Sequence, residues 1–184
     1  MLTRRAEGTQ SALRYYELAD LVNDREDPRK TPMYLDRCVW LRQQGLLDAA
    51  LANCRRAVKF EPTPFIIGQL GIVHMARGEY QAAANAFDRA VRGDPTSASY
   101  HYWRGAAYQQ LGHLDIAESE YLRAIVIDSA RYVWAYLHLG DMYEAEGKRE
   151  LACRMFREAL NSSDGSAVRY ARLRLEATGC EQST

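Results

Sequence analysis

The sequence predicts an all-α solenoid, a stack of antiparallel helix pairs, and three observations lead to this fold class. First, glycines recur at a pitch of 33 to 35 residues, at Gly45, Gly78, Gly112 and Gly147. Second, alanines and aromatic residues recur at fixed distances from a further set of glycines. Third, stretches such as FIIGQLGIVHMA carry apolar residues at 3- and 4-residue spacing, which is typical of helices.

Each copy of the repeat contains the same small and aromatic residues at the same spacing. Gly71, Gly105 and Gly140 each stand twelve residues before an alanine, which is followed by an aromatic residue four positions on and by a second alanine seven positions on. These residues are Ala83, Phe87 and Ala90, then Ala117, Tyr121 and Ala124, then Ala152, Phe156 and Ala159. The first copy instead has Cys38, Ala50, Cys54 and Ala57.

This spacing predicts two helices in each copy. The small residue in the middle of the first helix lets a second helix approach closely. Offsets of four and three place alanine, aromatic residue and alanine on one face of that second helix. The glycine between the two helices supplies the left-handed conformation that ends the first one.

The pattern resembles the tetratricopeptide repeat, whose signature is approximately W-x2-L-G-x2-Y, then A-x3-F, A and P over 34 residues. The matching residues include Leu70-Gly71, Pro95, Gly105 with Tyr108, and Leu139-Gly140 with Tyr143. The resemblance implies a right-handed superhelix of about four repeats over residues 31–164. We expect the repeats at 31–63, 64–97, 98–132 and 133–164.

Both ends of the chain continue the helical pattern. In residues 1–30, Ala12, Tyr16 and Ala19 repeat the spacing of a second helix. This segment is therefore either a half repeat with a linker, which we favour, or part of a longer array. Residues 165–184 predict a polar-backed capping helix followed by a tail, as solenoids need at their ends.

Composition and charge restrict the function. The chain has 184 residues, of which 47% are hydrophobic, and its 24 basic and 24 acidic residues cancel. A neutral chain is not built as a polyelectrolyte for nucleic acid, and no apolar run approaches the roughly 18 residues of a membrane span. We therefore expect another protein, or a second copy of this chain, as the partner. We expect no nucleic acid, membrane insertion, small-molecule substrate or cofactor.

Four cysteines are present, with neither C-x-x-C spacing nor a histidine at zinc-site spacing. The start MLTRRAEGTQ lacks the apolar segment of a secretory signal. We therefore expect reduced thiols and a cytoplasmic location. Cys38 and Cys54 fall on facing helices, so they are either small buried hydrophobes, which we favour, or a redox switch.

The resemblance also places a candidate binding groove on the concave face. Its second, fifth, ninth, twelfth and thirteenth repeat positions give the candidate partner-binding residues Leu35, Val39, Arg42, Phe65, Ile72, Met75, Tyr102, Gln109, Trp134, Leu137, Asp141 and Glu144. Phe65, Tyr102 and Trp134 would anchor an amphipathic helix or an extended peptide. Asp141 and Glu144 would favour a basic residue in that ligand. The alternative is that the chain itself covers these apolar residues.

A clamp for chaperone C-terminal carboxylates is not expected. The family uses basic and amide side chains there, whereas this chain has Leu35, Val39, Gln69, Ser99 and Trp103.

Catalysis is not expected either. His74 takes a core tyrosine position, and Asp115, Glu118 and Glu120 suit a solvated helix face. There is no phosphate-binding loop, nucleophile elbow or H-E-x-x-H motif. We expect a non-catalytic interaction module or scaffold that acts as an adaptor, assembly factor or chaperone-like partner. The alternative is a scaffold that assembles with itself through its end helices or its groove.

Overall fold

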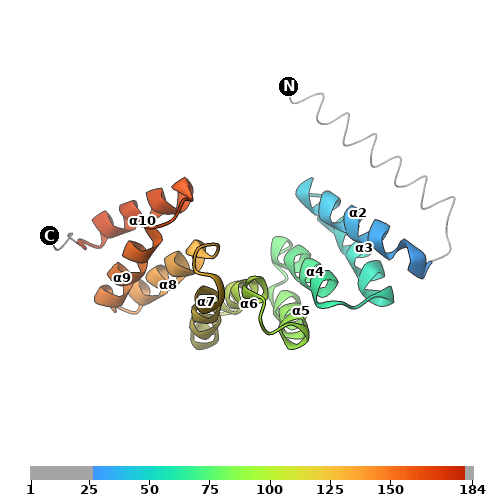
Figure 1. The fold of residues 1–184 in the computed structure, drawn as a ribbon, viewed down its shortest axis with the longest axis horizontal. Helices are drawn as coiled ribbons and strands as arrows, with labels where there is room; N and C mark the ends of the chain where they lie inside the picture. Colours follow the sequence, from blue (N-terminus) through green and yellow to red (C-terminus); the bar gives the residue numbers. More distant parts are fainter. Residues whose placement is uncertain (1–26, 181–184) are drawn as a thin grey trace, which may run out of the picture.

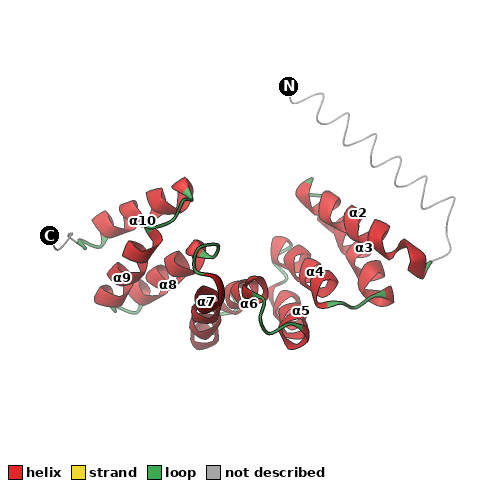
Figure 2. Ribbon diagram, in the orientation of Figure 1, coloured by secondary structure: helices red, strands yellow, loops and turns green. Residues whose placement is uncertain are grey.

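A computed structural model describes residues 27–180, and all regular structure in that range is helical (Figure 2). A short 3-10 turn, η1 (Pro28–Lys30), leads into nine α-helices there. The first four are α2 (Thr31–Gln43), α3 (Leu47–Phe60), α4 (Pro64–Ala76) and α5 (Tyr80–Gly93). The others are α6 (Ala98–Gln110), α7 (Leu114–Asp128), α8 (Val133–Ala145), α9 (Arg149–Ala159) and α10 (Gly165–Ala177). Ala12, Tyr16 and Ala19 lie outside the described residues.

The helices form four antiparallel pairs, α2–α3, α4–α5, α6–α7 and α8–α9, followed by α10. Figure 1 shows the pairs along an arc, with α2 and α10 at its two ends and α5, α7 and α9 on its outer side. Each second helix packs on its own first helix and on the first helix of the next pair. This is the predicted all-α solenoid, and the prediction is confirmed.

The mid-helix glycines work as the repeat pattern predicts. A Cβ atom on Gly71 would lie 2.8 Å from the ring of Phe87, and one on Gly105 would lie 3.0 Å from the ring of Tyr121. Both rings are fully buried. The small residue in the first helix is therefore what allows the aromatic ring of the second helix to enter the core.

The first helices end in one common way. Gly45, Gly78, Gly112 and Gly147 all have positive φ, as expected, and Gly179 after α10 does too, with φ of 62°. In each case the residue after the glycine donates its N–H to a carbonyl in the last turn of the helix, as Cys180 does to Leu175 at 2.9 Å. Helix α10 thus ends in the same way as the first helix of each of the four pairs. The sequence signal for this turn is Gly179, which lies 32 residues after Gly147.

Candidate binding groove

The open part of the groove lies between α4 and α6. A cavity of about 180 Å³ is lined there by Phe65, Gly68, Gln69, Ile72, Phe87, Ser97, Ser99, Tyr100 and Trp103. Phe65 stands beside it with 55% of its surface exposed. Trp103 forms one wall because its ring stacks on that of Phe87, with ring centroids 6.4 Å apart. Two of the twelve candidate residues, Phe65 and Ile72, therefore line a real cavity.

The α2 end of the groove carries a positive charge. Leu35, Val39 and Arg42 are all half-buried on α2. The Nε atom of Arg42 is buried and has no hydrogen-bond partner among residues 27–180. Arg42 is only half-buried and carries the charge at this end of the groove, so its guanidinium is a candidate ligand contact.

The middle of the groove is filled by aromatic rings. Tyr102 packs against Trp103, Tyr121, Tyr132 and His138, with ring centroids 5.3 to 6.0 Å apart. Its hydroxyl lies 3.3 Å from Nε2 of His138. Burial raises the pKa of Tyr102 and lowers the pKa of His138. Both side chains are therefore neutral near pH 7.

Gln109 and Met75 belong to the walls of the groove. Gln109 accepts a hydrogen bond of 2.7 Å from the hydroxyl of Tyr121. Met75 is half-buried and packs with Trp103 on the small cluster around Phe87. Leu137 is only 1% exposed. It is therefore a core residue, and it offers a ligand no surface in this structure.

Helix α10 covers the far end of the groove. Trp134 donates from Nε1 to Asp164 at 3.1 Å and packs on Tyr170, whose ring centroid is 6.1 Å away. The Tyr170 hydroxyl donates to Asp141 at 2.7 Å. The self-covered alternative holds at α8, and partner binding in the rest of the groove stays a prediction. The α4–α6 half has an open cavity, and the chain itself covers the α8 half.

The basic partner of the two groove carboxylates comes from the same chain. Arg174 of α10 donates from Nε to Asp141 at 2.9 Å and also pairs with Glu144. Burial and the hydrogen bond to Asp141 raise the pKa of Tyr170 to about 12. The sequence reasoning missed Tyr170 and Arg174 because it read α10 only as a cap.

The expectation of a solvated acidic face on α7 is wrong for Glu120. This carboxylate is only 8% exposed. It lies 2.7 Å from Nδ1 of His101 and accepts a hydrogen bond of 3.2 Å from Arg104. Glu118 accepts one of 2.5 Å from the Tyr143 hydroxyl. Of the three acidic residues, only Asp115 is exposed, as expected.

His74 occupies a buried position in the structure. His74 is 6% exposed, as expected for a core position, and its Nδ1 lies 2.5 Å from Glu79. Within the described residues, no group of three or more histidine, cysteine or acidic side chains could hold a metal ion. None of the helices there combines the length and the apolar composition that crossing a bilayer requires.

The expectation of reduced thiols is also wrong for this structure. Cys38 is bonded to Cys54, and Cys153 is bonded to Cys180. Cys38 and Cys54 are fully buried, as the small-hydrophobe interpretation requires. Burial alone did not reveal the bond, because the pairing depends on how the facing helices are placed.

Comparison with known proteins points to one repeat family. Family models described as "TPR repeat" and "Tetratricopeptide repeat" match residues 71–112, 98–131 and 135–168. Small glutamine-rich tetratricopeptide repeat-containing protein 2 of Saccharomyces cerevisiae is 33% identical over 94 residues, which is 51% of this chain. The match spans only 27% of that relative's length.

Solved structures share the fold. The MamA protein is 25% identical with a TM-score of 0.69, and the match covers 82% of this chain and 83% of that one. The first TPR domain of Spaghetti (RPAP3), solved bound to the HSP90 peptide SRMEEVD, is 22% identical with a TM-score of 0.56. That match covers 64% of this chain and 94% of that one.

Proposed function

Because the chain belongs to the tetratricopeptide repeat family, we propose that it is a non-catalytic interaction module that binds a peptide segment of another protein. The segment lies in the open half of the groove, across α2, α4 and α6. One observation carries the proposal, the cavity of about 180 Å³ beside the exposed ring of Phe65. In this role the protein is an adaptor, assembly factor or chaperone-like partner.

The cavity defines the first requirement on the ligand. Ile72, Phe87 and Trp103 give it apolar walls, and Gln69 and Ser99 add amide and hydroxyl groups to its lining. Such a site takes one aromatic or branched aliphatic side chain, while the polar groups hold the peptide backbone. The proposed ligand therefore carries one large apolar anchor residue.

Charge defines the second requirement. Among the family's concave positions on α2, α4 and α6, Arg42 is the only charged residue. Its buried Nε has no hydrogen-bond partner in the described part of the chain. An acidic side chain in the peptide pairs with the charged guanidinium of Arg42. A basic ligand residue is not proposed, because Arg174 already pairs with Asp141 and Glu144.

The proposed ligand is an internal segment rather than a free C-terminus. RPAP3 shares the fold and its first TPR domain was solved with an HSP90 peptide. At the family's carboxylate-clamp positions this chain has Leu35, Val39, Gln69, Ser99 and Trp103. None of these side chains is cationic, so a terminal carboxylate finds no charged partner there.

A selection from a displayed library of random 12-residue peptides tests the proposal. The full chain is the bait, and a matched bait carries Phe65→Ala. Enrichment of peptides with an aromatic or branched aliphatic residue and an acidic residue, on the unaltered bait only, supports the proposal. Failure to enrich any peptide, or equal enrichment on both baits, contradicts it.

Self-assembly through the end helices or the groove is the alternative function, and its readout is different. Light scattering coupled to size exclusion, over a concentration series, compares the full chain with a version that lacks residues 1–27. An oligomer that the truncation dissolves supports self-assembly. A monomer at all concentrations contradicts it and leaves the peptide-binding proposal unaffected.

A further inference from the structure

The two disulfides lie at opposite ends of the solenoid. Cys38–Cys54 joins α2 to α3, and Cys153–Cys180 joins α9 to the residue that follows the turn after α10. The Cα atoms are 5.2 Å and 5.7 Å apart, within the usual range for a disulfide. Within residues 27–180 there is no free cysteine. The two helix pairs between the bonds, α4–α5 and α6–α7, carry their cores without a covalent link.

In the first repeat, the disulfide stands where the other repeats place an aromatic ring over a glycine. Cys38 takes the position of Gly71 and Cys54 takes the position of Phe87. Both cysteines are fully buried, in a cluster with Leu41, Ala50, Leu51, Leu70 and Val73. The ring that fills the space between the two helices elsewhere is absent here. The covalent bond therefore replaces a large apolar contact, and two reduced thiols would replace it poorly.

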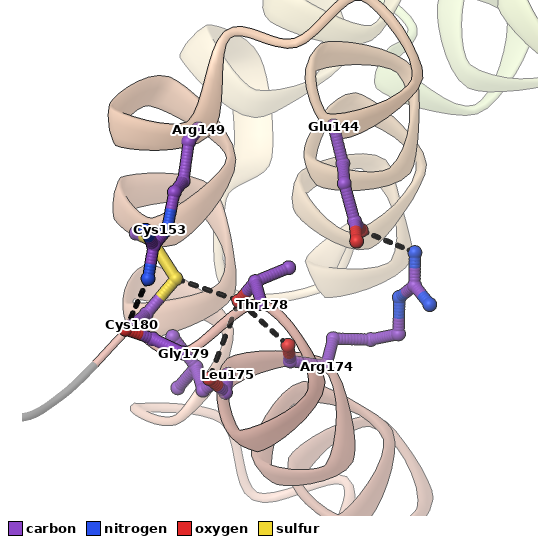
Figure 3. The surroundings of a disulfide bond; sticks show 8 residues. All are labelled: Glu144, Arg149, Cys153, Arg174, Leu175, Thr178, Gly179 and Cys180. Atoms are coloured by element: carbon purple, nitrogen blue, oxygen red, sulfur yellow. Dashed lines mark hydrogen bonds and ion pairs between the residues drawn. A yellow bond between two sulfur atoms is a disulfide. The ribbon is translucent and has the colours of Figure 1, made fainter.

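The second disulfide ties the C-terminal end of α10 to α9. In the earlier repeats the chain continues from the glycine turn into a second helix, which holds the turn in place. Residue Cys180 follows the turn at Gly179, and α10 is the last helix of the described residues. Figure 3 shows the bond to Cys153 together with the Arg149 side chain, which donates to the Gly179 carbonyl at 2.5 Å. The disulfide thus does for α10 what a following helix does for the other first helices.

We propose that both disulfides form in the working protein and that its two end units, α2–α3 and α10, are redox-dependent. Each pair of thiols loses two protons and two electrons to a disulfide-bearing oxidant, a protein or glutathione disulfide, which leaves as two thiols. Reduction reverses this step and loosens the two ends, while α5–α7 keep their packing. Paired cysteines of this kind are typical of oxidising compartments, so the protein works there rather than in the cytoplasm.

Hydrogen exchange on the full chain, with and without dithiothreitol, tests the proposal. The protein is produced in an oxidising compartment, and its intact mass should be lower than that of the reduced chain by four hydrogen atoms. Addition of the reductant should lower exchange protection in α2–α3 on the order of 100-fold and lower the Tm by about 5 to 10 °C. Protection in α10 should fall as well, and protection in α5–α7 should not change.

Two variants separate the bond from the packing. The double substitution Cys38→Gly with Cys54→Phe installs the glycine and ring of the second repeat. It should make protection in α2–α3 insensitive to the reductant, while α10 remains sensitive. The matched control, Cys38→Ala with Cys54→Ala, should be loose in α2–α3 under both conditions.

Two results would overturn the proposal. One is four free thiols in the protein from the oxidising compartment. The other is identical exchange in α2–α3 and α10 with and without dithiothreitol. Both readouts use the unaltered chain, so they decide the matter even if the glycine–phenylalanine variant does not fold. Neither depends on whether the groove binds a peptide.

Discussion

Arg174 of α10 and Asp141 of α8 form an ion pair at 2.9 Å across the concave face. Arg174 also pairs with Glu144 of α8. The two ion pairs hold α10 over the α8 half of the groove. Helix α10, the last helix of the described residues, therefore restricts the proposed ligand site to the α4–α6 half of the groove. The α8 half is occupied from within, and the α4–α6 half keeps its cavity.

Removal of this arginine should loosen α10. Arg174→Ala leaves Asp141 and Glu144 without their cation, and we expect the free energy of unfolding to fall by about 1 kcal/mol. Arg172→Ala is the matched control, because Arg172 is exposed on the same helix. Urea unfolding followed by circular dichroism measures both variants. Equal losses for the two would show that the ion pair contributes nothing specific.

The glycine beneath Phe87 should not tolerate a methyl group. Gly71→Ala places a Cβ atom 2.8 Å from a fully buried ring, so overpacking should cost about 1 to 3 kcal/mol. At Gly165, in the first turn of α10, the nearest atom is 3.8 Å away and belongs to the end of the Arg169 side chain. Gly165→Ala should therefore be neutral or stabilising by about 0.5 kcal/mol. Chemical denaturation that ranks the two variants the other way would contradict the role assigned to Gly71.

The carboxylate of Glu120 should matter far more than that of Asp115 on the same helix. Glu120→Ala leaves buried His101 and half-buried Arg104 without their shared acceptor, although Arg104 keeps its bond to Asp88. The loss should destabilise the protein by about 2 to 4 kcal/mol. Asp115→Ala, at an exposed position, should change stability by about 0.5 kcal/mol or less. Thermal unfolding of both variants tests this difference. A Tm for Glu120→Ala equal to that of Asp115→Ala would support the original interpretation, in which Glu120 lies on a solvated face of α7.

Stability should depend on pH through His138. Burial lowers the pKa of this histidine below its usual 6.5, so the folded state binds the proton more weakly than the unfolded state. Its contribution is therefore fully present above pH 6.5, and it is lost as the pH falls from there towards the lower folded pKa. His138→Gln should flatten the loss of stability between pH 7.5 and 5.5. His113→Gln, at an exposed position, is the matched control. Urea titrations at these pH values measure the free energy of unfolding of both variants. An equal dependence of this free energy on pH in the two variants would contradict the role of His138.

Local sequence pattern was sufficient for the helix pairs. The Gly71–Phe87 and Gly105–Tyr121 contacts follow from spacing within one repeat, because both partners lie on adjacent helices joined by a short turn. A strict pitch also located four of the five glycine turns in the described residues. Such features depend on residues that are close in the sequence, so one sequence without relatives is enough to predict them.

The features that the sequence did not predict all depend on contacts between repeats or on exact helix placement. Arg174 meets Asp141 from 33 residues away, and neither residue belongs to the repeat signature. Glu120 is buried because His101 and Arg104 of the preceding helix face it. The family's concave positions do not predict that α10 covers part of the groove, because these positions are defined within one repeat.

The affinity of one selected peptide for three proteins tests the central claim most directly. Isothermal titration would compare the unaltered chain with Phe65→Ala and with Val126→Ala, an 84% exposed apolar residue on the outer helix α7. The proposal predicts that loss of the Phe65 ring weakens binding about tenfold or more, while Val126→Ala leaves the Kd unchanged. Equal affinity for the unaltered chain and Phe65→Ala would contradict a ligand site in the α4–α6 half of the groove.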